Sequence, residues 1–256
     1  MTDQTITVLV CGGTSETGSW DTRTDVPGML ADSAKRLDSR FRAQWVPYPA
    51  VYGTSMPYDE SVRLGAGALL SQIDQLIGAP FVLWGYSQGC DVVRQALALL
   101  EPGADCLGVG MLADPGRHPD QWAGMARKPE GYGIRGAFRI DNSRFPVWSL
   151  SAQGDPISSL PAGNPLRLIA DLTDMMGLAG PAQRLAWFAD MVAKITAGQL
   201  QPWWTADHWR DWGGALAFAR GYVIDGRHTC YAHEIVPGLL STYTARLAQL
   251  TNTLSV

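Results

Sequence analysis

Apolar residues in this chain follow two patterns, short continuous runs and longer stretches with helical spacing. The continuous runs are 5–11, 43–48, 81–84, 106–116 and 146–156. The stretches with helical spacing are 28–40, 61–77, 91–97 and 236–252. Continuous runs are typical of strands buried on both faces, and strands that alternate with helices form parallel sheets covered by helices on both sides. The pattern therefore predicts an α/β protein with a central, mostly parallel sheet.

The alternation is interrupted over residues 158–220. Apolar positions there have helical spacing on both sides of Gly180-Pro181, which predicts two amphipathic helices, and no strand pattern lies between them. A cluster of four tryptophans follows at Trp203, Trp204, Trp209 and Trp212, before another short apolar run at 221–226. We expect one domain over 1–256, with 158–220 as an inserted helical linker or lid subdomain beside the ligand-binding edge of the sheet.

The segment Gly85-Tyr86-Ser87-Gln88-Gly89 lies between a predicted strand and a predicted helix. Glycines two residues before and after a serine relieve the clashes of a very tight strand-to-helix turn. Such a turn is a nucleophile elbow, which exposes the serine hydroxyl beside the amide groups of the helix N-terminus. A chance match is the alternative in a chain with 28 glycines, but the flanking elements favour the elbow. We therefore predict that Ser87 is a nucleophile.

A nucleophilic serine needs a base to take its proton and a carboxylate to orient that base. In folds with this type of elbow, the acid follows the serine along the chain and the histidine comes last. Asp155 stands at the end of the run 146–156 and precedes a proline, a placement that projects its carboxylate from the edge of the sheet. Asp114 has a similar context after the preceding run, but there a turn-capping role is favoured. Asp155 is the predicted acid.

The chain has four histidines, and two of them fit the base poorly. His118 precedes the predicted acid, and His208 lies among tryptophans in a predicted helix, where a packed or surface role is favoured. His228 lies just beyond the last predicted strand and within His-x-x-Tyr, where Tyr231 can pack the loop. His233 is nearer the final helix and is expected to be exposed. We predict His228 as the base and keep His233 as the alternative.

The negative charge that develops during attack on a carbonyl needs hydrogen-bond donors, which form the oxyanion hole. One donor is expected from the backbone amide of Gln88, directly after the serine. The second is expected from the loop after the first strand, where Thr14 and Ser15 follow Gly12-Gly13. An ordinary helix-entry loop with capping side chains is compatible with the same residues. We predict Thr14 and Gln88 as the oxyanion hole.

Composition excludes several other classes of protein. The net charge is −4 and the 20 lysines and arginines are scattered, which argues against nucleic-acid binding. The cysteines Cys11, Cys90, Cys106 and Cys230 lack zinc-ligand spacing and are expected to be small buried residues, with a Cys11–Cys90 disulfide left open. Residues 1–13 resemble neither a secretory signal nor a membrane span.

Four segments in this order, CGGTSETG, GYSQG, GDP and HTCY, resemble the cutinase branch of the α/β-hydrolases. Within that branch the chain is most similar to the lysin B esterases of mycobacteriophages, over nearly its whole length. The resemblance implies Ser87 as nucleophile, Asp155 as acid, His228 as base, and Thr14 with Gln88 as the oxyanion hole. It also implies hydrolysis of the ester that joins mycolic acids to arabinogalactan, without metal or cofactor.

The chain departs from plain cutinases in the 73 positions that separate Asp155 from His228, and it is similar to lysin B in having a helical insertion there. The resemblance implies synthesis in the cytoplasm of an infected host, and action at the host envelope after release without a signal peptide. The implied partners are mycolyl-arabinogalactan or another long-chain lipid ester and the outer mycolate layer, with no nucleic acid and no stable protein partner. The tryptophans and Met175-Met176 would suit long acyl chains.

One further expectation and two alternative functions accompany this hypothesis. A separate N-terminal peptidoglycan-binding module is not expected, because the first predicted strand begins at residue 5. A cutinase-like lipase or carboxylesterase that acts on free lipids or polyesters is the nearest alternative. A non-enzymatic envelope-binding protein on a retained hydrolase fold is a more distant one.

Overall fold

The computed structural model describes residues 5–53, 55–164, 166–173, 189, 193, 196–198 and 226–255. Several sequence predictions lie outside these described residues. They are the second predicted helix of the insertion for most of its length, Met175-Met176, the four clustered tryptophans, His208 and most of the run 221–226. The boundaries predicted for the inserted subdomain, 158–220, therefore stay a prediction.

In the described residues, the centre of the molecule is a sheet of five parallel strands in the order β2-β1-β3-β4-β5. The strands are β1 (Ile6–Cys11), β2 (Phe41–Trp45), β3 (Phe81–Tyr86), β4 (Cys106–Leu112) and β5 (Val147–Leu150). The chain adds β2 on one side of β1 and then returns to place β3 on the other side. The direction of strand addition therefore reverses between β1 and β3, and at such a switch point the two following loops diverge and leave a crevice for a ligand.

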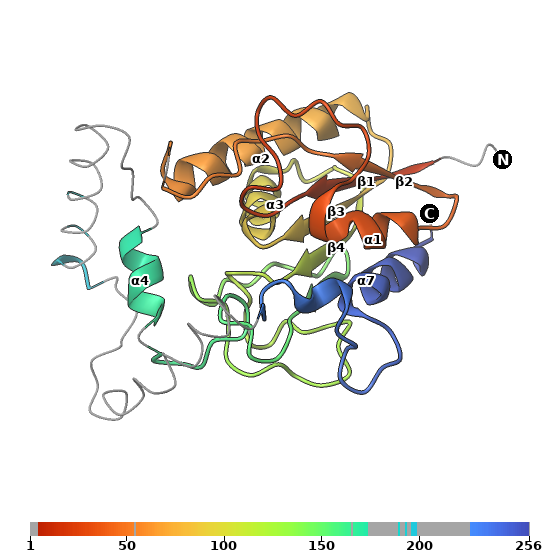
Figure 1. Ribbon diagram of the computed structural model, residues 1–256. Coiled ribbons are helices and arrows are strands. Elements are labelled where there is room, and N and C mark those ends of the chain that lie inside the picture. The colour runs from red at the N-terminus through yellow and green to blue at the C-terminus, as the bar shows by residue number, and fades with distance from the viewer. Residues whose placement is uncertain are drawn as a thin grey trace.

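Helices cover both faces of the sheet (Figure 1). One face is covered by α2 (Tyr58–Gln75) and α3 (Gln88–Leu99), and the other by α1 (Ala31–Lys35) and α7 (Tyr243–Asn252). Alternate side chains of β1 serve the two cores, since Leu9 packs in the α2–α3 cluster and Val8 in the α1–α7 cluster. Burial on both faces explains why β3 and β4 are apolar along their whole length, whereas the edge strand β2 carries Arg42 and Gln44.

Shorter elements complete the described part of the chain. They are the 3₁₀ turns η1 (Gly28–Leu30) and η2 (Cys230–Ala232) and the helix α4 (Leu166–Thr173). None of the described helices is both long enough and apolar enough to cross a membrane. The thiols of Cys11, Cys90, Cys106 and Cys230 are free, the first three are buried, and the last is half-buried. The Cys11–Cys90 disulfide that the sequence left open is thus not formed.

The predicted α/β architecture is confirmed, with shifts at element ends. The helix predicted for 28–40 is a 3₁₀ turn followed by α1, which ends at Lys35, and β2 begins at Phe41 instead of residue 43. The last helix begins at Tyr243 and not at residue 236, because a bridge between Ile235 and Thr242 closes a turn there. The Thr242 hydroxyl then caps α7 by accepting a hydrogen bond from the Ala245 amide at 3.2 Å.

Candidate active site

Ser87 stands at the sharp turn between β3 and α3, with φ 52° and ψ −120°. This positive φ is strained for a residue with a side chain, and such strain is typical of a nucleophile elbow. The flanking glycines permit the turn. A Cβ on Gly89 would lie 2.1 Å from the carbonyl oxygen of Cys11, and a Cβ on Gly85 would lie 2.7 Å from the Cα of Cys90. The elbow predicted from the sequence is present, and its helix packs against the end of β1.

The structure brings the three predicted catalytic side chains together. The Nε2 atom of His228 lies 2.8 Å from the Oγ atom of Ser87. Its Nδ1 atom lies 3.1 Å from Oδ1 and 3.2 Å from Oδ2 of Asp155. Asp155 follows β5 and His228 precedes η2, so loops at the carboxyl edge of the sheet supply both partners of the elbow serine. These distances allow proton transfer from serine to imidazole while the carboxylate orients the ring.

The competing candidates lie in other environments. Asp114 accepts a hydrogen bond from the Gly116 amide at 2.8 Å and pairs with Arg94 at 2.6 Å, in agreement with a turn-capping role. His233 is exposed, as expected from its position before the final helix. The ring of His118 accepts a hydrogen bond from the Asp120 amide at 3.2 Å. None of these contacts involves Ser87.

Asp155 is completely buried, and four groups contact its carboxylate. His228 contacts both oxygens, the Ile157 amide donates to Oδ1 at 2.9 Å, and the hydroxyls of Ser158 and Tyr231 donate to Oδ2. Burial raises the pKa of the Asp155 carboxyl, but the charge and hydrogen bond of His228, with the Tyr231 hydroxyl, outweigh it and leave the pKa below its usual range. The group is therefore an anion near neutral pH. Ser158 carried no signal in the sequence.

Tyr86 holds the backbone of the histidine loop. Its hydroxyl donates to the carbonyl oxygen of His228 at 2.8 Å, and its ring lies 5.5 Å from the imidazole with an interplanar angle of 20°. Tyr86 directly precedes Ser87, so the elbow itself fixes the loop that carries His228. The sequence analysis gave this tyrosine no role, although its place inside the motif Gly-Tyr-Ser-Gln-Gly was a signal.

The predicted oxyanion residues are neighbours at the elbow. Gln88 is buried and begins α3, where the first amide groups of a helix have no partner within the helix. The Thr14 hydroxyl lies 3.4 Å from the Gln88 side-chain oxygen, and the Gln88 side-chain amide nitrogen donates to the carbonyl of Val51 at 3.0 Å. The loop after β1 therefore faces the helix N-terminus, as the sequence predicts. The assignment of both residues to an oxyanion hole stays a prediction.

Glu16 anchors the loop after β1. Its carboxylate accepts hydrogen bonds from the Gly13 amide at 2.8 Å and the Met29 amide at 2.7 Å. Gly13 lies against the elbow, since a Cβ there would come within 2.9 Å of the Tyr86 ring and 3.3 Å of the Ser87 Cβ. Burial raises the pKa of Glu16, and the two amides only partly offset this. The sequence analysis considered capping side chains in this loop only as an alternative and missed the anchoring role of Glu16.

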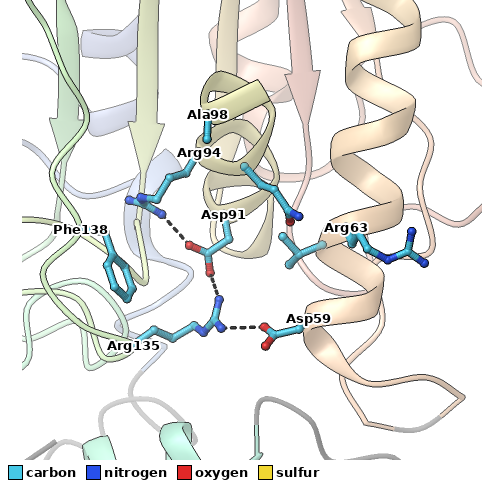
Figure 2. A pocket seen from close by; sticks show the side chains of 9 residues that line it. Asp59, Arg63, Asp91, Arg94, Ala98, Arg135 and Phe138 are labelled. Carbon is cyan, nitrogen blue, oxygen red and sulfur yellow. Dashed lines mark hydrogen bonds and ion pairs between the residues drawn. The ribbon is translucent and has the colours of Figure 1, made fainter. Parts of the chain in front are cut away.

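A network of ion pairs begins at Asp91, one helical turn beyond Ser87 (Figure 2). The buried carboxylate of Asp91 binds Arg94 at 2.6 Å and Arg135 at 2.7 Å, and it accepts a hydrogen bond from the Tyr58 hydroxyl at 2.8 Å. Arg135 also pairs with Asp59 at 2.7 Å. Burial raises the pKa of Asp91, but the two arginines outweigh it and hold the pKa below its usual range. The network joins α2, α3 and the loop after β4.

The parallel sheet, the elbow at its switch point and a histidine in contact with both the elbow serine and an aspartate define the α/β-hydrolase fold. Residues 41–194 match the PE-PPE domain, and the chain belongs to this family. No curated protein matches the sequence.

Solved structures show how far the likeness extends. Lysin B from Mycobacteriophage D29 is 22% identical, with a TM-score of 0.60, and the match covers 98% of this chain and 100% of that one. The catalytic core domain of acetyl xylan esterase from Trichoderma reesei is 19% identical, with a TM-score of 0.48 over 62% of this chain and 87% of that one. A cutinase-like protein from Cryptococcus sp. is 16% identical, with a TM-score of 0.43 over 77% and 96%. The full-length likeness to lysin B confirms the fold that the sequence motifs predict.

Proposed function

We propose that this protein is a serine carboxylic ester hydrolase, with Ser87 as nucleophile, His228 as general base and Asp155 as the acid of the triad. One observation carries the proposal. The imidazole bridges the other two groups, at 2.8 Å from the Ser87 hydroxyl and 3.1 Å from the Asp155 carboxylate, and Ser87 lies on a strained turn.

The proposed reaction has two halves. In the first, Nε2 of His228 takes the proton of Ser87 as Oγ attacks the ester carbonyl carbon, and the amide of Gln88 and the loop at Thr14 stabilise the oxyanion. The carbon–oxygen bond to the alcohol then breaks, and His228 gives its proton to the departing alcohol. In the second half, water attacks the acyl-serine, its proton passes to His228, and release of the carboxylic acid returns that proton to Ser87. Asp155 stays ionised throughout and stabilises the imidazolium.

For the substrate we propose the ester that joins mycolic acids to arabinogalactan. Two observations support this choice, the likeness to lysin B along the full chain and the 73 positions between acid and base, where the sequence predicts a helical insertion. Attack on this ester would place the protein at the outer mycolate layer of a mycobacterial envelope. Synthesis in the cytoplasm of an infected host and later release belong to the same proposal.

The triad is tested with purified full-length protein and p-nitrophenyl esters of increasing acyl length. We expect Ser87→Ala and His228→Ala each to lose about 10⁴-fold or more in kcat while circular dichroism stays unchanged, because the triad acts as a unit. His233→Ala is the matched control and should retain most of its activity, because this side chain is exposed outside the triad. A serine-directed phosphonate should form an adduct on Ser87. Unchanged turnover by Ser87→Ala would disprove the triad.

The substrate is tested separately with isolated mycolylarabinogalactan. Release of free mycolic acid by the wild-type protein, but not by Ser87→Ala, is the expected result. Hydrolysis of short p-nitrophenyl esters without any release of mycolic acid would contradict the substrate and favour the cutinase-like alternative, while leaving the triad intact.

A further inference from the structure

The triad carboxylate has no contact with solvent, so protein groups must satisfy it. Its Oδ2 atom receives hydrogen bonds from the hydroxyls of Tyr231 and Ser158, the latter at 2.9 Å. Each hydrogen bond that a buried carboxylate accepts changes how strongly that carboxylate holds a neighbouring proton. The hydroxyl donors on Oδ2 therefore act on the imidazole through Asp155, without touching a substrate.

The Tyr231 hydroxyl donates its proton to one defined acceptor, the carboxylate of Asp155. The hydroxyl oxygen accepts a hydrogen bond from the Ala152 amide at 3.1 Å, which leaves its single proton to be donated. Burial, together with the neighbouring charge of Asp155, raises the pKa of Tyr231 well above its usual value, so the hydroxyl stays protonated. The nearest strong acceptor is the carboxylate of Asp155. Ser158 lies 3.0 Å from the same hydroxyl and 2.7 Å from Ser151, so the donors form one connected chain.

The Tyr231 ring is held in place by two other tyrosines. Its centroid lies 5.1 Å from the Tyr243 ring and 6.4 Å from the Tyr86 ring, in edge-to-face arrangements with interplanar angles of 63° and 67°. The side chain is completely buried. A hydroxyl on such a rigid ring keeps its geometry during the reaction, which is what a group that positions a catalytic side chain requires.

We propose that Tyr231, with Ser158 beside it, is a positioning residue for the triad, whose hydroxyl fixes the Asp155 carboxylate and moderates its hold on the His228 proton. This inference rests on the proposed esterase function. A purely structural tyrosine, which contributes only its ring to the core, would leave the proton affinity of the triad unchanged. The two roles are therefore separated by the pH dependence of the reaction.

The test compares Tyr231→Phe with the matched control Tyr243→Phe, since both variants keep the ring and lose one buried hydroxyl. We expect Tyr231→Phe to lower kcat/KM for a p-nitrophenyl ester by about 10- to 100-fold, because the acid is less well placed. The acidic limb of its pH–rate profile should also move to higher pH, because a carboxylate with one donor fewer holds the imidazolium proton more strongly. Tyr243→Phe should keep the wild-type profile, since no hydroxyl contact joins Tyr243 to Asp155 in the described residues.

Wild-type pH dependence in Tyr231→Phe, or an equal change in Tyr243→Phe, would overturn the inference. Should Tyr231→Phe fail to fold, Ser158→Ala removes the second donor and should move the same limb in the same direction, by a smaller amount. An unmoved limb in that folded variant would also overturn the inference. A wild-type protein without any ester turnover would instead refute the proposed function itself, so the two failures are distinguishable.

Discussion

At the scale of single residues, the backbone next to Gly89 leaves no space for a side chain. A Cβ there would lie 2.1 Å from the Cys11 carbonyl oxygen and 2.6 Å from that of Gly12. Both atoms belong to the backbone at the end of β1, so neither can move without shifting the strand. The elbow and the loop after β1 can therefore approach each other this closely only because residue 89 has no side chain.

We predict that Gly89→Ala destabilises the protein by about 1–3 kcal/mol or more, because overpacking against backbone forces the strand and helix apart. Ester turnover should fall with it, since Ser87 and Gln88 lie directly before the displaced position. Thermal unfolding and p-nitrophenyl ester hydrolysis measure the two effects. Gly67→Ala is the control, because Gly67 is exposed in α2 and a Cβ added there would meet nothing within 4 Å. It should gain about 0.5–1 kcal/mol. Equal behaviour of the two variants would contradict this account.

The sequence predicts the site best where its chemistry is local. Ser87 is defined by a motif of five adjacent residues, and Asp155 and His228 follow from chain order and from loops at one sheet edge. Ser158 and Glu16 were missed because what they do depends on partners fixed only by folding, an aspartate in a turn and two loop amides. The type of a residue with a hydroxyl or carboxylate does not identify the group that it will contact in the folded protein.

At the scale of elements, the long connection between β4 and β5 has little regular structure, yet buried arginines hold it in place. Arg117 donates to the carbonyl of Ser158 at 2.6 Å and to the carbonyls of Glu130 and Gly131 at 2.8 Å. Arg167 on α4 donates to the Gly133 carbonyl at 2.5 Å. Periodicity could not predict this arrangement, because the contacts join side chains to backbone far away in sequence. The inner strands were predictable because strands buried on both faces consist of consecutive apolar residues.

The Asp91 network fastens the same connection to α3. Replacing Arg135 with Met would leave the buried Asp91 with Arg94 and the Tyr58 hydroxyl as its remaining partners. Leaving a buried charge without any partner costs about 3–5 kcal/mol, so we expect Arg135→Met to lower the free energy of unfolding by more than about 1 kcal/mol and by less than that amount, measured by urea denaturation at pH 7.

The control for this variant is Arg36→Met, which breaks an exposed pair with Asp32 on α1. Such surface pairs contribute only about 0.3–0.5 kcal/mol. Equal losses in Arg135→Met and Arg36→Met would show that the buried network does not stabilise the fold.

At the scale of the whole molecule, one geometric rule brings Ser87 and Asp155 to the same edge. The five described strands are parallel, so the loops that follow β3 and β5 leave the sheet on the same side. His228, 141 positions after Ser87, meets both side chains there. The switch point between β1 and β3 places the loop of Thr14 beside the elbow in the same way. The fold and the meeting of these three side chains were thus predictable together, whereas their catalytic roles stay a prediction and most of the insertion lies outside the described residues.

Buried carboxylates in three separate regions also couple the stability of the whole fold to pH. Asp91 and Asp155 have lowered pKa values, and so does Asp21 in the loop after β1. For Asp21 the main cause is the hydrogen bonds from Arg23, and Trp45 on β2 donates to the same carboxylate at 3.0 Å. A carboxyl with a lowered pKa in the folded state stabilises the protein above its unfolded pKa of about 3.9, and this contribution is lost as the pH falls toward the folded value.

We therefore predict that the contribution of these groups to the free energy of unfolding changes little between about pH 5 and 8. Below about pH 4 it should fall steeply. Asp21→Asn isolates one of them without touching the triad. This variant should be less stable than the wild type at pH 7, because it lacks the charge that binds Arg23. The difference in free energy of unfolding should shrink as the pH falls to about 3, because the wild-type carboxylate begins to lose its stabilising contribution below the unfolded pKa. Urea denaturation at several pH values measures it, with ester turnover at pH 7 as a check that the active site is intact. A stability difference that stays constant from about pH 7 to about pH 3 would show that Asp21 contributes through packing and not through its charge.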